Sequence, residues 1–523
     1  MADPGRSRMV VLAMVMGLGL VLVARLITSP GNDGEGTTST TPSLEVTTTG
    51  AVGSPSTSTP AQTSLPVEER PEGTVPAWTV GMPWGTTNGL TMFRGNPTRT
   101  YYGQGPAPSD PSVLWRTPDN GGLCGESTNL GVTKTWCGTG WTGQPVVWER
   151  PDGITELIFG AYDHNVHFLD AATGEPTRNA FETGDLVKGS GSLDPDGYPL
   201  IYFGSRDNKL RVVALDREDP TELWSMDATA VEGTWNDDWD GDPVILDDIL
   251  YEGGENGWFF AIELNRGYDS EGKATVDPRV LFDMPSYDQD FIDLSGINVS
   301  IENSVAVFDQ RVYFANSGGR IMGLDISNIR SGEAPVVFDY WAGGDIDATL
   351  VVDDQGMLYA SVNVKPDQIA LGYRTQGNID RTKEIGQILK LDPYRDGDPR
   401  IWGVDLTAGN DQSGSWSTVA LHLGEVYVNS MTGKLLAIDG ETGDVDWTDS
   451  VGWHTWGSPV VVDDTLVTTT CDGQLRSYSL ADPRQPASNW SFQISDSCIE
   501  ATPAVWKGVA YFGSRDGGFY AVG

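Results

Sequence analysis

The sequence predicts an all-β fold, an eight-bladed β-propeller of four-stranded antiparallel blades that is closed by strands from its two ends. Three observations predict it. A pattern of β runs and tight turns returns at intervals of roughly 50 residues, which is typical of propellers and solenoids. The chain contains 18 Trp, 17 Tyr and 64 Gly, a composition that favours turn-rich aromatic strands over helices. The last repeat lacks a strand that the front of the domain can supply.

The clearest copy of the repeat is 425–447, EVYVNSMTGKLLAIDGETGDVDW. Two β runs flank a Thr-Gly turn, and Asp439, Thr442 and Gly443 then form a second turn before Trp447 opens a third run. Asp accepts backbone N–H bonds in such turns, and Gly supplies the positive φ that they often need. The next run is 458–462, and together these four antiparallel runs make one predicted blade. Seven further copies begin near Leu157, Leu200, Ile249, Arg311, Met357, Thr465 and Val509.

The two ends of the domain have complementary deficits. The copy at Val509 stops at Gly523, before any third run. A spare run, Pro111–Thr117, stands at the front of the domain and is followed by Gln144–Trp148. A ring closed by its own termini explains both facts, and closure protects edge strands that an open stack would expose. We predict eight blades, with seven as the alternative.

These blades resemble the pyrroloquinoline-quinone-repeat family, whose signature places Ala-x-Asp before a Thr-Gly turn and a Trp. Ala437, Asp439, Thr442, Gly443 and Trp447 match it fully. Partial matches are found at Ala214, Asp216 and Trp224, and at Asp170, Thr173 and Gly174. In that family the Trp docks between neighbouring blades, so the resemblance implies structural roles for Trp447 and Trp224.

The resemblance leaves the activity open, because the family contains quinone-dependent dehydrogenases and also non-catalytic members. The dehydrogenases typically carry a disulfide between adjacent cysteines beside the quinone. Here the cysteines are Cys124, Cys137, Cys471 and Cys498, with no adjacent pair and no C-x-x-C-H. We therefore predict no quinone cofactor.

Four cysteines in an exported chain indicate two disulfides. If the strands of a blade run A, B, C, D from the axis outward, the B–C turns and D–A loops share one face. Cys124 and Cys137 fall in one D–A connection, Cys471 in a B–C turn and Cys498 in the next D–A loop. The short-range solution pairs 124 with 137 and 471 with 498, each bridge contributing about 3 kcal/mol.

The N-terminal region predicts export. Residues 1–8 form a basic n-region, and 9–27 form a signal-anchor helix about 28 Å long, close to a bilayer core of about 30 Å. No A-x-A site follows, and a cleaved signal peptide is the alternative. In the Ser/Thr/Pro/Gly-rich stretch 28–77 we expect a disordered linker, either bare or glycosylated. The propeller is then 78–523, outside the plasma membrane and monomeric.

A net charge of −40 restricts the classes of partner that the protein can bind. So acidic a surface repels nucleic acid and anionic lipid, and we expect membrane contact only through the N-terminal helix. Metal cations, basic peptides and amino sugars remain as classes that it could attract.

A Trp precedes strand A in four predicted blades, at Trp141, Trp239, Trp416 and Trp456. Rings at this place lie near the channel mouth, where propeller ligands commonly bind. Aromatic faces stack on sugars and cations, so these four residues are candidate ligand-binding residues. The alternative is that each indole packs between blades.

A calcium-loop pattern, N-x-D-x-D-G, covers 236–241, and Asp247 falls at its twelfth position. The intervening run 243–246 reads as strand A and would carry Asp247 about 13 Å away. We keep a smaller Ca²⁺ site at Asp238 and Asp240 as a hypothesis.

No catalytic motif stands out, and no catalytic residue is predicted. We predict a non-catalytic, tethered extracytoplasmic scaffold that binds a protein or a cell-envelope polymer. The alternative is an enzyme that acts on envelope carbohydrate or a quinone-dependent oxidoreductase. The sequence does not name the ligand.

Overall fold

A computed structural model describes residues 70–129, 131–140, 143–365, 372, 374–407, 412–452 and 454–523. The predicted n-region (1–8), the signal-anchor helix (9–27), most of the linker (28–77) and Trp141 lie outside the described residues. Among the helices of the described part, none combines the length and the apolar character that a membrane span requires.

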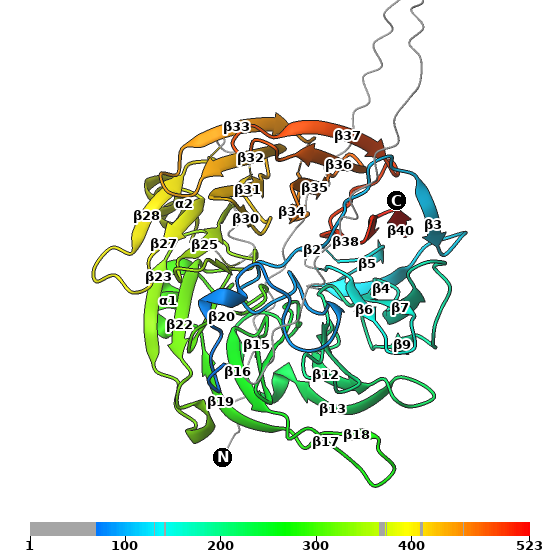
Figure 1. Ribbon diagram of the computed structural model, residues 1–523. Coiled ribbons are helices and arrows are strands. Elements are labelled where there is room, and N and C mark those ends of the chain that lie inside the picture. Colours follow the sequence, from blue (N-terminus) through cyan, green and yellow to red (C-terminus); the bar gives the residue numbers. More distant parts are fainter. Residues whose placement is uncertain are drawn as a thin grey trace, which may run out of the picture. The chain divides into compact units, whose positions relative to one another are not determined.

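The described residues form eight antiparallel blades around a common axis, as Figure 1 shows. This confirms the predicted fold and the count of eight over seven. The innermost strands, A, are β6 (Val146–Glu149), β10 (Ser192–Leu193), β14 (Val244–Leu246), β20 (Ala306–Phe308), β24 (Val351–Val352), β30 (Ala420–His422), β34 (Val460–Val462) and β38 (Ala504–Trp506). The B strands are β7 (Thr155–Gly160), β11 (Leu200–Gly204), β15 (Ile249–Gly253), β21 (Arg311–Ala315), β25 (Leu358–Ser361), β31 (Glu425–Asn429), β35 (Thr465–Thr469) and β39 (Val509–Gly513).

The outer half of each blade follows the same order. The C strands are β8 (Asn165–Asp170), β12 (Lys209–Ala214), β16 (Trp258–Glu263), β22 (Arg320–Asp325), β27 (Ile388–Leu391), β32 (Lys434–Asp439), β36 (Gln474–Ser479) and β40 (Phe519–Val522). The outermost strands, D, are β9 (Phe181–Glu182), β13 (Thr221–Asp227), β19 (Arg279–Pro285), β23 (Val336–Trp341), β28 (Arg400–Val404), β33 (Val445–Ser450), β37 (Ala487–Gln493) and β3 (Val113–Thr117). The blades are numbered 1 to 8 in this order.

Blade 8 is completed by the front of the domain, as the sequence predicts. Strand β3 pairs antiparallel with β40, with Trp115 opposite Ala521 and Thr117 opposite Phe519. Ring closure therefore rests on a hydrogen-bonded ladder between segments about 400 residues apart in the chain.

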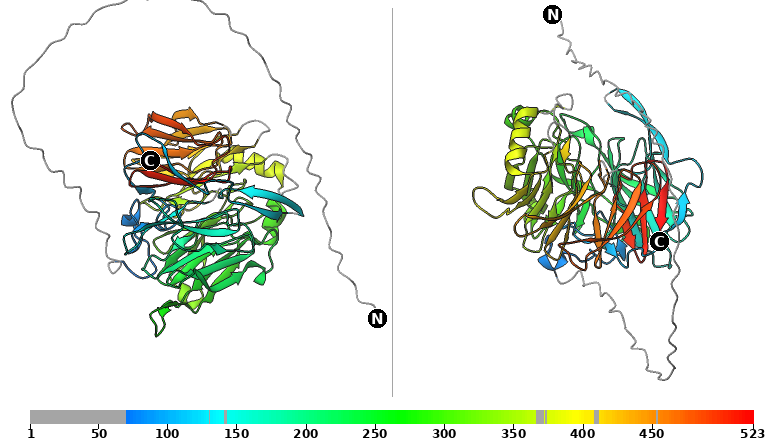
Figure 2. Two further views of the ribbon diagram at one scale, coloured as in Figure 1. Left: turned by 90° about the vertical axis from the view of Figure 1, so that its right-hand side faces the viewer. Right: turned by 90° about the horizontal axis from the view of Figure 1, so that it is seen from above.

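Several short elements lie outside the blades. These are the hairpins β4 (Cys124–Asn129) with β5 (Val132–Cys137) and β17 (Gly267–Tyr268) with β18 (Ala274–Thr275), the pair β26 (Asn363–Val364) with β29 (Ser413–Gly414), and the helices α1 (Gln289–Ser295) and α2 (Thr375–Ile385). Figure 2 shows the cyan β4–β5 hairpin extending from the body of the propeller.

The Thr-Gly turns receive tryptophans from the preceding blade. Trp402 of blade 5 donates from Nε1 to the carbonyl of Gly440 and packs on Gly443, where a Cβ would come within 2.8 Å of the indole. Trp115 of blade 8 packs on Gly174 in the same way. Both glycines also have positive φ, so no other residue fits as well. Trp447 packs edge-on against Tyr478 of the next blade, which confirms the docking role implied by the family resemblance.

The axis is filled by a segment that the sequence analysis does not single out, residues 84–104, here called the plug. Its strands β1 (Gly89–Leu90) and β2 (Gly103–Gln104) pair with the innermost strands of blades 1 and 8. Its backbone carbonyls accept from Leu193 of blade 2, Val307 of blade 4 and Val352 of blade 5. The A strands have free edges toward the axis, and the plug supplies the partners that buried backbone groups require.

Two fully buried arginines of the plug reach the remaining blades. Arg94 donates to the carbonyls of Thr418 and Val419 in blade 6 and of Pro459 in blade 7. Arg99 pairs with Asp242 of blade 3 at 2.8 Å. The plug therefore contacts every blade.

The segment before the plug is also ordered on the propeller. Val75 forms a β-bridge with Asp309, and Arg70 binds the carboxylate of Asp247. Residues 70–77, assigned to the linker by sequence, are thus part of the folded domain as the structure describes it.

Candidate functional site

The loops that lead into the innermost strands bring charged and aromatic side chains together near the axis. Both disulfides lie on the same side, which we call the disulfide face. The D–A loops contribute Lys188, Asp238, Asp240, Glu302, Asp345, Asp347, Trp416, Trp456 and Glu500, and the B–C connections contribute Arg206, Glu255, Lys365 and Arg515. We call the eleven charged residues of this set the axial charge network.

Lys188 is the centre of the first part of the network. Its Nζ lies 3.2 Å from Asp238, 2.6 Å from Asp240 and 2.8 Å from Glu255. Arg206 Nε adds a second cation 3.1 Å from Asp238. These three carboxylates can each present an oxygen within 4.8 Å of the others, a spacing that suits a metal ion. The ammonium of Lys188 takes up that central place.

Burial governs the protonation of this group. It raises the pKa of Asp238 to about 7, with the charge of Glu255 adding to the shift, and it raises the pKa of Asp240 well above its usual value. Burial also disfavours the Lys188 ammonium, but the three carboxylates outweigh it and hold the pKa of Lys188 well above its ordinary value. Lys188 therefore stays charged while part of the acidic charge is neutralised by protons.

Lys365 is the centre of the second part. It forms an ion pair with Asp345 and lies 3.7 Å from Asp347, which also accepts from the Ser317 hydroxyl. Its Nζ stands 4.9 Å from the centre of the Trp416 ring, and Trp416 packs edge-on against Trp456 at 4.6 Å. A pocket between blade 5 and α2 adjoins this cluster and is lined in part by Asp345, Asn363 and Lys365.

Glu302 connects the two parts. Burial raises its pKa well above the usual value, and the charges of Asp347 and Glu255 add to the shift. The pKa of Asp347 is also well above its usual value, mainly because of burial and next because of the charge of Asp345. Charges from both parts of the network thus contribute to the raised pKa of Glu302.

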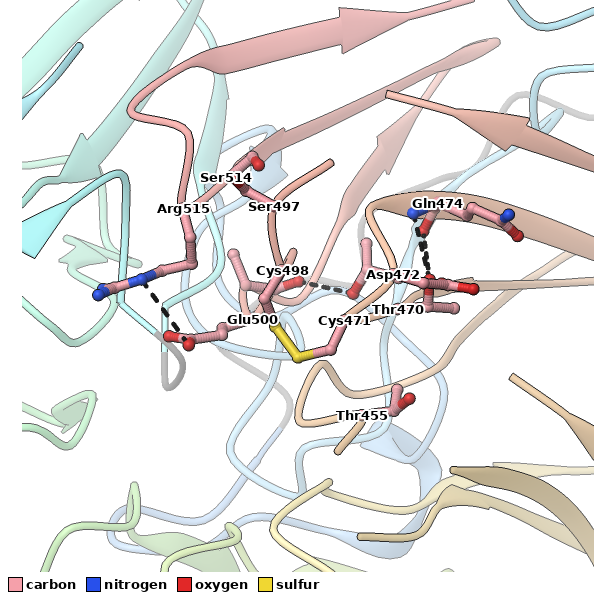
Figure 3. Close-up of a disulfide and its surroundings, with 12 residues drawn as sticks. Thr455, Thr470, Cys471, Asp472, Gln474, Ser497, Cys498, Glu500, Ser514 and Arg515 are labelled. Atoms are coloured by element: carbon pink, nitrogen blue, oxygen red, sulfur yellow. Dashed lines mark hydrogen bonds and ion pairs between the residues drawn. A yellow bond between two sulfur atoms is a disulfide. The ribbon is translucent and has the colours of Figure 1, made fainter. Parts of the chain in front are cut away.

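Glu500 and Arg515 complete the network beside the second disulfide. Figure 3 shows Arg515 facing Glu500, next to the bridge between Cys471 and Cys498. Their charged atoms are 3.8 Å apart, and burial raises the pKa of Glu500 to about 7 against the opposing effect of Arg515. The disulfide ties the B–C turn and the D–A loop of one blade and so fixes this part of the site.

Both predicted disulfides are present, 124 with 137 and 471 with 498. The first closes the base of the β4–β5 hairpin, where Cys124 and Cys137 are opposite each other in register. Since the bridged cysteines are 13 and 27 residues apart in sequence, neither bridge is the adjacent-cysteine disulfide expected of a quinone dehydrogenase. The residues present thus do not fit that quinone site, and we derive no step through a quinone.

The candidate tryptophans occupy different environments. Trp239 is fully buried, packs against Phe260 and donates to the carbonyl of Asn208. This is the packing arrangement that the sequence analysis holds as the alternative. Trp416 and Trp456 are half-buried beside Lys365. Ligand binding by the tryptophans stays a prediction.

The candidate metal residues, Asp238 and Asp240, do lie together, and the structure adds Glu255 to them. Asp247 is not part of the group, since it lies beyond β14 and binds Arg70. A Ca²⁺ ion here has to displace Lys188, and the calcium hypothesis stays a prediction.

Sequence reasoning did not find Lys188, Glu302 or Lys365. Lys188 lies in a D–A loop, and a search of these loops for basic as well as acidic residues would have found it. Lys365 begins an insertion between strands B and C of blade 5, where the repeat pattern is interrupted. That interruption, visible as the gap between MLYASVNV and QILKLD, is the signal for this part of the site.

The fold and this network define a propeller with a charged axial site on one face. Residues 384–523 match the family model described as outer membrane protein assembly factor BamB, of the PQQ-repeat type. The match covers 140 of the 523 residues, and over that part the chain is similar to β-propellers of the pyrroloquinoline-quinone-repeat type. No curated protein matches the chain.

Three solved structures are similar to parts of this chain. BamB from Moraxella catarrhalis is 17% identical, with a TM-score of 0.48 over 70% of this chain and 93% of that one. Quinohemoprotein alcohol dehydrogenase from Comamonas testosteroni is 13% identical, with a TM-score of 0.49 over 83% of this chain and 80% of that one. The computationally designed protein Ika8 is 12% identical, with a TM-score of 0.49 over 74% and 96%. These similarities concern the fold alone.

Proposed function

We propose that the protein is a non-catalytic, membrane-tethered extracytoplasmic scaffold whose axial charge network binds a cationic group of a protein or cell-envelope polymer. The observation that carries the proposal is a charge imbalance. Among the described residues, seven carboxyl groups (Asp238, Asp240, Glu255, Glu302, Asp345, Asp347 and Glu500) meet only four cations (Lys188, Arg206, Lys365 and Arg515).

The protonation of the network supports this reading. Burial holds the pKa of five of these carboxyl groups above their ordinary values, so protons supply part of the missing positive charge. An ammonium or guanidinium of a ligand can take the place of such a proton and restore the charge balance. Binding of a cation is therefore expected to release protons and to strengthen as pH rises through 7.

The half-buried rings of Trp416 and Trp456 supply the second component of the site. Trp416 already lies against one cation, Lys365, at 4.9 Å. Indole faces attract ammonium and guanidinium groups and also stack on sugar rings. A ligand that combines an amine with an apolar or sugar surface suits this pairing of carboxylates and indoles. A net charge of −40 would steer such a ligand toward the protein.

Calorimetric titration of the purified full chain tests the proposal. The probes are hexalysine and a glucosamine hexamer, each paired with its fully N-acetylated form, at pH 6 and pH 8. We expect one site per chain, loss of binding on acetylation and stronger binding at pH 8. The better of the two amine probes then separates a peptide from a polysaccharide ligand.

Variants locate the binding. We expect Asp347→Asn and Trp416→Ala to weaken binding at least tenfold, and the exposed Asp354→Asn, which lies outside the network, to leave it unchanged. Equal binding of the acetylated probes, or full binding by Asp347→Asn, would refute the proposal. Stoichiometric binding of pyrroloquinoline quinone with dye-linked turnover would replace it with the oxidoreductase alternative.

A further inference from the structure

A second acidic cluster lies in blade 6, outside the axial charge network. Glu425 begins β31, Asp439 ends β32 and Asp446 lies in β33, so three neighbouring strands each contribute one carboxylate. Glu425 and Asp439 are direct partners in the ladder. The three carboxylates can present oxygens within 4.8 Å of one another. Like charges directly opposite each other destabilise a sheet, so this arrangement calls for a compensating cation.

Glu425 is the member of the cluster that lacks adequate compensation. Its side chain is 5% exposed, and its Oε2 has no hydrogen-bond partner among the described residues. Burial, and then the charges of Asp446 and Asp439, raise its pKa to about 7. A buried carboxylate oxygen without a partner is costly, and this one belongs to a cluster that a metal ion could bridge.

Arg484 provides the compensation that is present. It binds Asp446 at 2.5 Å and Asp439 at 2.9 Å, but its Nε is 3.8 Å from Glu425. The Arg484 side chain is 57% exposed, so its ion pairs contribute little and it is free to turn toward solvent. The cluster borders an open groove between blades 5, 6 and 7 that is also lined by Asp482.

We propose that Glu425, Asp439 and Asp446 form a Ca²⁺ site, and that Arg484 occupies it in the absence of the ion. The cluster offers oxygen ligands only, which hard cations prefer, and it contains no Cys or His that would favour zinc. Ca²⁺ accepts irregular sets of carboxylates with water completing its shell, whereas Mg²⁺ demands a nearly ideal octahedron. The site is independent of the axial function proposed above.

Titration of the full chain with CaCl₂ at pH 8, after removal of bound ions with EGTA, tests the site. Trp447 follows Asp446 directly in the chain, so Tb³⁺ bound in place of Ca²⁺ is expected to luminesce on excitation of tryptophan. We expect Glu425→Gln to weaken Ca²⁺ binding at least tenfold and Arg484→Gln to strengthen it about fivefold, because the competing charge is removed.

Two controls make the result decisive. Asp354→Asn neutralises an exposed carboxylate that lines the same groove outside the cluster, and we expect no change. Asp240→Asn removes one of the carboxyl groups of the axial charge network, and Ca²⁺ binding is expected to persist. Any one of three results would overturn the proposal. These are wild-type Ca²⁺ affinity in Glu425→Gln, weaker Ca²⁺ binding in Arg484→Gln, and loss of Ca²⁺ binding in Asp240→Asn while Glu425→Gln still binds. Asp446→Asn serves in place of Glu425→Gln if the latter does not fold.

Discussion

Blades 1 and 6 have the same pair of acidic residues at the same position, but the two pairs differ in the cations and hydrogen-bond donors around them. In blade 1, Glu156 of strand B lies opposite Asp170 of strand C. In blade 6, Glu425 lies opposite Asp439 in the same register. Both glutamates are buried. The backbone of the repeat is therefore the same, and the difference lies in the side chains that compensate the charge.

Blade 1 compensates its glutamate completely. Arg178 contacts both carboxylate oxygens of Glu156, at 3.0 and 2.9 Å, Arg150 adds a bond at 3.1 Å, and the Thr177 hydroxyl donates a further one. Two cations and a hydroxyl thus surround one fully buried carboxylate. The Glu156 carboxylate is therefore fully paired by protein groups and has a structural role.

Blade 6 replaces these donors with another acid. Asp446 follows Asp439 by seven residues, as Thr177 follows Asp170. A hydroxyl donor is thereby exchanged for a carboxylate, and among the described residues the cation that forms ion pairs with the cluster is the exposed Arg484. A repeat fold gives side chains in different copies the same position. A copy in which a buried carboxylate lacks the cations found in other copies is therefore a candidate place for a bound cation.

The largest expected effect comes from breaking the compensated pair. Arg178→Met leaves the Glu156 carboxylate partly unpaired in the interior, and we expect the free energy of unfolding to fall by about 3 kcal/mol. The matched change in blade 6, Arg484→Met, is expected to cost far less, because that arginine is exposed. Urea denaturation measures both. Equal losses would show that the two blades do not differ as described.

Calcium is expected to give the next largest effect. An ion held at a hundred times its dissociation constant stabilises the folded state by about 2.7 kcal/mol. The corresponding rise in Tm should appear in the wild type and disappear in Glu425→Gln. If Ca²⁺ raises the Tm of both proteins equally, the ion acts elsewhere in the molecule.

The pH dependence of the free energy of unfolding is also expected to reveal the incompletely paired Glu425 of blade 6. The folded-state pKa of Glu425, about 7, lies above its usual value, because burial, Asp446 and Asp439 disfavour the charge while Arg484 only partly offsets them. Asp482 also faces this group and raises its pKa. The folded state then holds a proton that the unfolded state releases, so the stability from Glu425 is full below about pH 4.5 and is lost as pH rises through 7.

In EGTA we expect the Tm to fall as pH rises from 5 to 8, with Glu425 accounting for about 1.5 kcal/mol. Asp238 and Glu500, whose pKa values are also raised to about 7 by burial, act in the same direction. Differential scanning calorimetry of Glu425→Gln is expected to show a smaller fall. A fall as steep as that of the wild type would remove the case for a strained carboxyl in blade 6.

The smallest effect is expected from converting blade 6 toward blade 1. Asp446→Thr replaces a carboxylate by a hydroxyl beside Glu425 and should stabilise the ion-free protein by about 0.5 kcal/mol at pH 8, since one like-charge contact is removed. Carboxyl NMR is expected to show a lower pKa for Glu425. An unchanged pKa would mean that burial alone sets the charge state of this group.

The sequence predicted much of the fold because the fold is repetitive and local. Each copy carries its own turn residues, such as Asp439 and Gly443, and blades 1 to 7 each form from strands that follow one another in the chain. Closure followed from the unpaired run 111–117, which β3 confirms. The loops of all four cysteines lie on one face of the ring, and the pairing followed from the short separations in the chain, 124 with 137 and 471 with 498.

The candidate site was predicted only in its location. The loops before the A strands do converge, and Asp238 and Asp240 do meet, but the residue at their centre is Lys188, which belongs to a different blade. Nothing in the repeat pattern distinguishes the carboxylates that receive a cation from those that do not. Glu156 and Glu425 have the same place in the repeat and differ only in partners from outside their own strand pair.

By itself the sequence predicts eight blades, with seven left open, and it predicts the closure of the ring and the two disulfides. Turns and strands are local within each repeat, and the spare run 111–117 matches the strand that the last repeat lacks. Only the tertiary structure decided what fills the axis and which buried charges are paired. Arg94 donates to a carbonyl 325 residues away, and Lys188 reaches Glu255 across 67 residues. Such pairings depend on where loops meet after the ring has closed, so no local pattern records them.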